Sequence, residues 1–170
     1  ERIQLQVDQL IINANLDTHR FSPFGLPLVS DTIGNFWGPL AGILAGMEWS
    51  NKNAPNVSHI LSIPTDVPFL PVDLVQRLES AIQTNNESIV LARSNNNIHG
   101  VIGLWPVALS AKLDQALRQG TRKVLDWTNT QKALYVDFPL IEIEGKYVDP
   151  FFNINTPADL KIAQELIQSV

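Results

Sequence analysis

One carboxylate, Asp66, stands at a position suited to chemistry. It directly follows the apolar run 57–64 and lies between Pro64 and Pro68, which stiffen its loop. A lone carboxylate at the end of a strand suits Mg²⁺, which proteins usually hold with one or two carboxylates while substrate phosphates and water complete the shell. The alternative is a loop aspartate that accepts backbone hydrogen bonds or caps the next helix. Spacing alone leaves both open.

Side-chain amides occur in pairs at two other places. Asn13 and Asn15 end the first apolar run of the chain, and amides read the edge of a base or ribose through paired donors and acceptors, although asparagine is equally common in turns. Asn153 and Asn155 share one face of an extended segment before a helix, where Asn155 or Thr156 is placed to be the N-cap. A cap explains one asparagine and leaves Asn153 unexplained.

Weaker signals come from an aspartate, a glycine segment and a basic pair. Asp31 ends a second short apolar run and is either a ligand contact or a turn residue. Gly38 begins a Gly-Pro-Leu-Ala-Gly segment that is similar to a phosphate-cradling turn but lacks the lysine and spacing of a P-loop, so its glycines equally permit close helix packing. Arg122 and Lys123 suit a phosphate, although a solvated helix start is the commoner role for such a pair.

Nucleophilic catalysis finds no support in the sequence. The three histidines, His19, His59 and His99, are spaced 40 residues apart and have no metal-ligand spacing. We expect His59, inside an apolar run, to be a hydrogen-bonded core residue, and we favour a structural role for His99. No serine lies in a glycine-flanked nucleophile elbow. The chain has no cysteine, which excludes disulfides and thiolate zinc sites.

Strand and helix patterns alternate along the chain, and these elements must position the polar residues. Alternation predicts a three-layer, Rossmann-like α/β fold with a mostly parallel central sheet, in which the strand 57–64 is buried on both faces. Ligands bind such folds at the carboxyl ends of the strands, where Asn13, Asp31 and Asp66 all lie. The expected strands are 9–13, 26–29, 57–64, 89–92, 101–105 and 134–138. The expected helices follow Gly38, run from Pro71 to Asn85 and Asn86, and cover 108–117, 123–127 and 158–167.

Composition describes one globular domain covering residues 1–170. The chain is 45% apolar and 17% charged, and a domain of this length buries roughly 70% of the surface of its unfolded chain. The net charge of −5 argues against nucleic acid as a partner. Apolar runs fall short of the roughly 20 residues of a membrane helix. Without cysteine, a cytoplasmic location is the expectation.

The order of these motifs resembles the molybdenum cofactor guanylyltransferase family (MobA-type), within the α/β nucleotidyltransferases. The resemblance spans nearly the whole chain and rests on five segments: 12–15, Asp31, 38–42, 64–68 and 153–157. Members transfer GMP from GTP to molybdopterin and release pyrophosphate, with Mg²⁺ as cofactor. The resemblance therefore implies GTP and molybdopterin as substrates, and molybdoenzymes or their chaperones as protein partners.

The resemblance also implies roles for individual residues. Asn13, Asp31, Gly38 and Asp66 would bind the guanine nucleotide, and Asp66 would coordinate Mg²⁺. A catalytic role near the reacting phosphates falls to Asp66, Asn153 and Asn155. The pterin phosphate would face Arg122 and Lys123. Transfer between phosphates needs no Ser-His pair, because the attacking phosphate oxygen is already an anion and the protein supplies mainly alignment and charge neutralisation.

The family also has a feature with no counterpart in these 170 residues. Its members begin with a central strand and a glycine-rich loop, ending in Arg-Met-Gly and a following lysine, that binds the triphosphate. We expect roughly 20 to 35 residues, enough for a strand, loop and helix, to precede this sequence. We then also expect 10–13 and 60–63 not to pair with each other. Two alternatives stay open: a related CTP-dependent or sugar-phosphate nucleotidyltransferase, and a non-catalytic remnant that binds a nucleotide or a protein.

Overall fold

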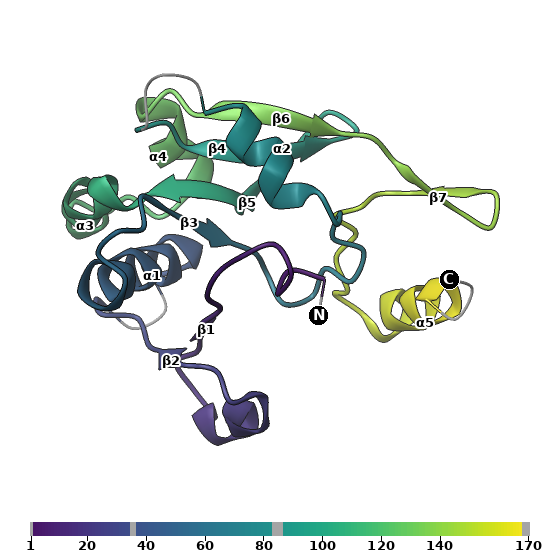
Figure 1. Ribbon diagram of the computed structural model, residues 1–170, viewed down its shortest axis with the longest axis horizontal. Helices are drawn as coiled ribbons and strands as arrows, with labels where there is room; N and C mark the ends of the chain where they lie inside the picture. Colours follow the sequence, from purple (N-terminus) through teal and green to yellow (C-terminus); the bar gives the residue numbers. More distant parts are fainter. Residues whose placement is uncertain (1, 35–36, 83–86, 168–170) are drawn as a thin grey trace.

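Apolar segments from the middle of the chain form the central sheet (Figure 1). The computed structural model describes residues 2–34, 37–82 and 87–167. Four strands lie in the order β3 (His59–Ser62), β5 (Asn97–Pro106), β4 (Val90–Ser94) and β6 (Leu134–Phe138). β5 runs antiparallel to both of its neighbours, whereas β4 and β6 are parallel. The sheet is mixed, so the prediction of a mostly parallel sheet is wrong.

The reason for the mixed sheet is a tight turn between β4 and β5. Asn95 and Asn96 both have positive φ angles, 46° and 62°, and Ser94 pairs with Asn97 across the turn. Two successive residues with positive φ make the two-residue turn that matches the twist of a hairpin, and asparagine tolerates this conformation. β5 therefore folds back beside β4 without the helical crossover that a parallel neighbour requires.

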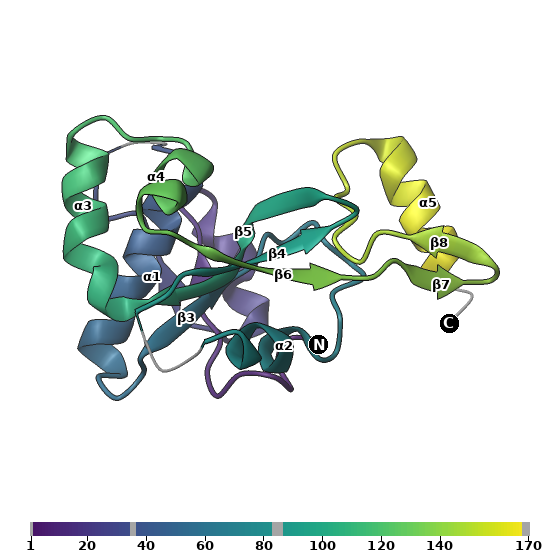
Figure 2. The same ribbon diagram turned by 90° about the horizontal axis from the view of Figure 1, so that it is seen from above.

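Different helices cover the two faces of the sheet. Leu91 and Trp105 face α1 (Pro39–Asn53), α3 (Ser110–Arg118) and α4 (Val124–Thr130), whereas Val90 and Ala92 pack with Leu74 and Leu78 of α2 (Leu74–Ser80). Adjacent residues of β4 thus enter opposite cores, as the period of two in a strand requires. Helices on both faces give the three layers that the alternation predicts (Figure 2).

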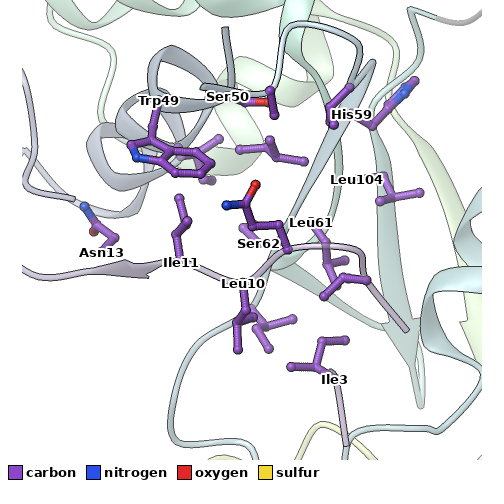
Figure 3. Close-up of a pocket in the computed structure, with 18 of the residues that line it drawn as sticks. Ile3, Leu10, Ile11, Asn13, Trp49, Ser50, His59, Leu61, Ser62 and Leu104 are labelled. Atoms are coloured by element: carbon purple, nitrogen blue, oxygen red, sulfur yellow. The ribbon is translucent and has the colours of Figure 1, made fainter. Parts of the chain in front are cut away.

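The N-terminal strands form a separate small sheet. β1 (Ile12–Asn13) pairs in parallel with β2 (Leu28–Val29) and, among the described strands, with no other. Residues 10–13 and 60–63 are therefore not paired with each other, as expected. A cavity of about 1420 Å³ borders both β1 and β3 (Figure 3). All four residues of β3 are half-buried, so the prediction of a strand buried on both faces is wrong, because side chains of β3 line this cavity.

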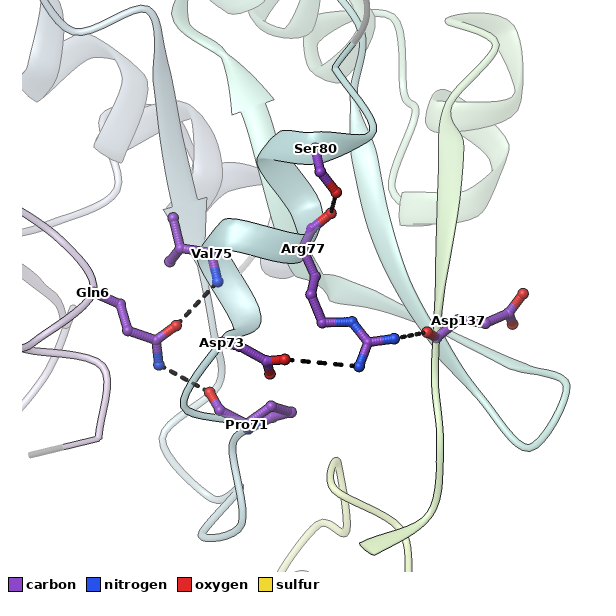
Figure 4. Close-up of polar contacts among 7 residues, drawn as sticks. All are labelled: Gln6, Pro71, Asp73, Val75, Arg77, Ser80 and Asp137. Atoms are coloured by element: carbon purple, nitrogen blue, oxygen red, sulfur yellow. Dashed lines mark hydrogen bonds and ion pairs between the residues drawn. The ribbon is translucent and has the colours of Figure 1, made fainter.

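The side chain of Gln6 links the segment before β1 to the start of α2 (Figure 4). The amide nitrogen of Gln6 donates to the carbonyl of Pro71 over 2.9 Å, and its amide oxygen accepts from the N–H of Val75 over 3.0 Å. The N–H groups of a first helical turn lack partners within the helix, and Asp73 makes no side-chain cap there. Gln6 thus supplies the missing acceptor from a distant part of the chain.

A third apolar cluster lies at the C-terminal end of the domain. Phe69 and Ile143 pack there with Ala163 and Leu166 of α5 (Pro157–Ile167). The unpredicted hairpin of β7 (Ile141–Ile143) and β8 (Lys146–Val148) completes it, and a short 3₁₀ helix, η1 (Thr18–Phe24), was likewise not predicted. The expected helix end at Asn85 and Asn86 lies outside the described residues. Within the described part of the chain, no helix is long and apolar enough to cross a membrane.

Candidate active site

The ends of β1 and β2 bring three predicted residues together. Because the two strands are parallel, Asn13 and Asp31 emerge at the same edge. The Asp31 carboxylate accepts from the side-chain amides of Asn13 and Asn15 over 3.0 and 2.8 Å. Asn15 in turn accepts from the backbone N–H of Asp31 over 2.8 Å. Asn13, Asn15 and Asp31, which we call the amide cluster, thus point along one strand edge and line the cavity.

Helix α1 approaches the amide cluster through a glycine. A Cβ atom at Gly42 would lie 2.5 Å from Oδ1 of Asn13, too close for any side chain. The Asn13 amide cannot easily retreat, because its nitrogen donates both to the Asp31 carboxylate and to the carbonyl of Val29. Gly38, with φ 80°, stands at the N-cap of α1 and also lines the cavity. Of the two uses predicted for this glycine segment, close packing is confirmed at Gly42.

The basic pair divides into two different environments. Arg122 donates to the carbonyls of Leu117 and Thr121 over 2.6 and 2.8 Å, and its guanidinium lies 4.0 Å from the centre of the Trp37 ring. Arg122 thereby closes the C-terminal end of α3 and reaches the loop before α1. Lys123 is exposed, and within the described residues its side chain has no hydrogen bond or ion pair, although its backbone carbonyl accepts from the N–H of Trp127. The structure brings Arg122 next to Gly38, whose Cβ position lies 3.9 Å from the Arg122 carbonyl.

A second cluster joins the loop after β3 to the segment before α5. The backbone N–H of Ile154 donates to the carbonyl of Asp66 over 2.9 Å. Asn153 and Asn155 flank this anchored residue and are both exposed, so they share one side of the extended segment. The structure therefore brings together Asp66, Asn153 and Asn155, which are separated by almost 90 residues of sequence. We call these three residues the carboxylate cluster.

Of the two residues predicted to cap the helix that follows, Thr156 is the N-cap and Asn155 is not: the Thr156 hydroxyl accepts from the backbone N–H of Asp159 over 3.2 Å. The carboxylate of Asp159 accepts from the backbone N–H groups of Asn155 and Thr156, and from the Thr156 hydroxyl. These hydrogen bonds, first that of the Thr156 side chain, hold the pKa of Asp159 below its usual value. Since Thr156 and Asp159 cap the helix together, the side chains of Asn153 and Asn155 are both left for a ligand.

The chemistry of Asp66 fits a hard cation. Its Oδ1 is buried and has no hydrogen-bond partner among the described residues. A buried, unpaired carboxylate oxygen is costly unless a charge or donor satisfies it. Among the described residues, no three or more His, Cys, Asp or Glu side chains are placed to hold a metal ion together, so a cation at Asp66 would have at most two such ligands from them. Mg²⁺ accepts such an arrangement when substrate phosphates and water supply its remaining ligands.

The cavity extends from the amide cluster toward the loop of the carboxylate cluster. Asn13, Asp31 and Gly38 line one part of it, and Ile63, three residues before Asp66, lines another. Figure 3 shows side chains of the N-terminal segment, α1 and β3 around this one space. The members of the carboxylate cluster are not among its lining residues. The described site thus consists of two polar clusters. The cavity is lined by the amide cluster at one part and by the segment just before the Asp66 loop at another.

Some residues of the site were not predicted. Trp37 packs against the Arg122 guanidinium, a contact that no pattern in the sequence indicates. Gly42 belongs to the predicted glycine segment, but its contact with the Asn13 side chain was not predicted. His59 is also not the satisfied core residue that we expected. It is half-buried and borders the cavity, where burial lowers its pKa.

Comparison with known proteins agrees with these motifs. Residues 1–133 match the model of the MobA-like NTP transferase domain. A molybdenum cofactor guanylyltransferase of Bradyrhizobium sp. (strain ORS 278) is 42% identical over 97% of this chain and 76% of the relative. One of Rhizobium meliloti (strain 1021) is 42% identical over 96% of this chain and 75% of the relative.

A solved structure supports the fold. The molybdopterin-guanine dinucleotide biosynthesis protein A from Archaeoglobus fulgidus matches with a TM-score of 0.59 at 20% identity, over 90% of this chain and 74% of that one. The resemblance drawn from the motif order is therefore confirmed by the family match, by the sequence relatives and by the fold. The chain belongs to the MobA-like NTP transferase family, among the molybdenum cofactor guanylyltransferases.

Proposed function

We propose that this chain transfers GMP from GTP to molybdopterin, releasing pyrophosphate and forming the guanine dinucleotide form of the cofactor. The relatives named above carry this activity in their names at 42% identity over nearly the whole chain. The structural observation that supports it most is the carboxylate cluster, in which Asp66 has a buried unpaired oxygen beside two exposed asparagines. This arrangement suits a reaction between phosphates.

The chain's own residues align the substrates and neutralise charge. The amide cluster has two donors and a carboxylate at one strand edge, suited to hold the guanine nucleotide. Asn153 and Asn155 donate amide hydrogens to phosphate oxygens, where negative charge builds as the pterin phosphate attacks the α-phosphorus. Asp66 would hold Mg²⁺, which when bound would neutralise charge on the phosphate oxygens. No general base is required, because the attacking oxygen is already ionised.

We further propose that a strand and glycine-rich loop, as in the family, occupy the cavity between β1 and β3. Residues 10–13 and 60–63 flank this cavity without pairing to each other. Strands that end at a cavity with unpaired backbone groups are places where a further strand would complete the hydrogen bonding. A loop at the end of that strand would lie beside Gly38 and the amide cluster, where a triphosphate must be held.

Substrate contacts and partners complete the proposal. Lys123, exposed and unpaired within the described residues, is the better candidate for the pterin phosphate, whereas Arg122 shapes the loop before α1. Molybdoenzymes or their chaperones are the proposed protein partners. A cytoplasmic location stays a prediction based on a chain without cysteine.

The test measures pyrophosphate release by the intact protein with Mg²⁺, molybdopterin and either GTP or CTP. Release with GTP and not with CTP is expected. Release with CTP alone would indicate a cytidylyl transferase and overturn the base assignment. Release with neither nucleotide would favour a non-catalytic protein that binds nucleotide or a partner.

A further inference from the structure

A buried polar cluster lies beside the turn where β4 ends and β5 begins. The hydroxyl of Ser94, a residue only 1% exposed, lies 2.6 Å from Nε2 of His99 and 2.7 Å from both carboxylate oxygens of Asp149. Ser94 and His99 come from the β4–β5 hairpin, whereas Asp149 follows β8. Three polar side chains from two distant parts of the chain thus meet beside the β4–β5 turn.

The hydrogen inventory of this cluster fixes the direction of each bond. The Ser94 hydroxyl has one hydrogen, and the ionised Asp149 carboxylate can only accept it. Nε2 of His99 must therefore carry a hydrogen and donate it to the Ser94 oxygen. Burial lowers the pKa of His99, against the opposing effect of the Asp149 carboxylate. Both the neutral and the charged imidazole can keep the Nε2 hydrogen, so the bonds persist whichever form is present.

This arrangement is not a hydrolytic triad. In such a triad the histidine stands between serine and carboxylate and takes the serine proton. Here the serine stands in the middle, and its hydroxyl donates a hydrogen bond to the carboxylate. With Ser94 almost fully buried, its oxygen is also out of reach of a substrate. The cluster therefore needs a role other than nucleophilic catalysis.

Asp149 connects the cluster to the segment that carries the catalytic asparagines. Its carboxylate accepts from the backbone N–H of Phe151 over 2.8 Å, and its carbonyl accepts from the N–H of Phe152 over 3.0 Å. The Phe151 ring lies 4.7 Å from the His99 ring, measured between centroids. The side chains of Asp149 and His99 thus both hold the turn 149–152. Two residues after this turn, the backbone N–H of Ile154 donates to the Asp66 carbonyl.

We propose that Ser94, His99 and Asp149 form a positioning cluster that holds the turn 149–152 and so places Asn153 and Asn155 against the Asp66 loop. The proposal rests on the function proposed above for those asparagines. None of the three residues touches substrate. Their effect on turnover passes through the extended segment, which has its own anchor at Ile154 and a capped helix beyond it.

Hydrogen exchange tests the placement without requiring activity. In Ser94→Ala we expect the amides of Phe151 and Ile154 to exchange at least tenfold faster than in the wild type, while those of β6 exchange at the wild-type rate. Ser80→Ala, which removes an exposed serine hydroxyl on α2, is the matched control and should change neither rate. Wild-type exchange at Phe151 and Ile154 in Ser94→Ala would overturn the proposal.

Steady-state kinetics test the consequence. Ser94→Ala should lower kcat about tenfold at temperatures where it is fully folded, with KM for GTP unchanged, because the amide cluster is intact. His99→Phe, which keeps a ring against Phe151 but removes the donor, should do the same, and His99→Gln, which can restore a donor, should recover part of kcat. A wild-type kcat, or a fall in apparent kcat no larger than the unfolded fraction measured by circular dichroism, would contradict a positioning role. If the wild type itself has no turnover, the proposed function fails, and the exchange rates still decide this proposal.

Discussion

At the scale of single residues, the site depends on one carboxylate oxygen that has no hydrogen-bond partner and on one glycine that has no space for a side chain. Asp66 has a buried oxygen without a partner, and Gly42 has no room for a methyl group. The two conditions have different origins: the first leaves a position for a ligand, and the second places the amide of Asn13. Each leads to a substitution with a matched control.

Asp66→Asn should lower kcat by about 10²–10³-fold, the usual effect of removing one preorganised charge from a transition state. The amide keeps the size of the side chain, so the thermal midpoint should stay within a few degrees of the wild type. Pyrophosphate release measures the first effect and circular dichroism the second. Asp73→Asn, a nearby half-exposed aspartate with only a 3.9 Å ion pair, should keep wild-type turnover. An active Asp66→Asn protein would remove Asp66 from the metal site.

Gly42→Ala and Gly46→Ala form a second matched pair on α1. Alanine favours a helix over glycine by about 1 kcal/mol. At Gly46 the new methyl meets only the end of the Ile60 side chain, at 3.0 Å, so stability to urea should be unchanged or slightly higher. At Gly42 it displaces the hydrogen-bonded Asn13 amide, and stability should fall by about 1 kcal/mol despite the helix gain. Equal stability of the two variants would show that the Asn13 amide is not held as described.

At the scale of elements, the start of α2 depends on a residue from outside the helix. Gln6→Ala leaves the N–H of Val75 without its acceptor, and it removes one of the two donors to the carbonyl of Pro71, which keeps the N–H of Leu74. Loss of a helix-start acceptor typically costs about 1 kcal/mol. Urea unfolding should show this loss, whereas Gln4→Ala, at an exposed position without such contacts, should unfold like the wild type. A Gln6→Ala protein as stable as Gln4→Ala would contradict the capping role.

Most elements could be predicted from the sequence, whereas the direction of the strands could not. Apolar spacing predicts strand β6 and helices α1 and α5. The strand has the predicted bounds, α1 begins directly after Gly38, and α5 ends at Ile167, as predicted. The error lay in the turns. Neither Asn95 and Asn96 nor Glu144 and Gly145 are predicted as turns above, yet both pairs have positive φ and both make hairpins. Turn geometry, not apolar spacing, sets the strand direction.

At the scale of the whole molecule, each cluster of the site could be predicted only as a set of candidates. Parallel pairing of β1 and β2 places Asn13 beside Asp31, which the principle of ligand sites at strand ends anticipates. The contact between Ile154 and the Asp66 carbonyl could not be predicted, because no local pattern encodes an approach across almost 90 residues. The role of Arg122 also changed, since its partners are carbonyls and a ring from other elements.

The stability of the whole domain should fall as the pH drops below about 6.5. Burial lowers the pKa of both His59 and His99. The unfolded chain takes up protons near pH 6.5, while the folded protein takes them up only at lower pH, so stability present above 6.5 is lost as the pH falls. Urea midpoints at pH 7.5 and 5.5 measure this loss. His59→Gln should reduce it and the exposed His19→Gln should not. A wild-type midpoint equal at both pH values would contradict the expectation.

The central claim is that the two clusters serve transfer of GMP between phosphates. Its most direct test is a single-turnover reaction of the intact protein with molybdopterin, Mg²⁺ and GTP labelled at either the α- or the γ-phosphate. The account predicts that the α-label appears in the pterin dinucleotide and the γ-label in pyrophosphate, with both transfers lost in Asp66→Asn. An α-label recovered only as free GMP or in unreacted GTP, or a γ-label transferred to the pterin, would contradict it.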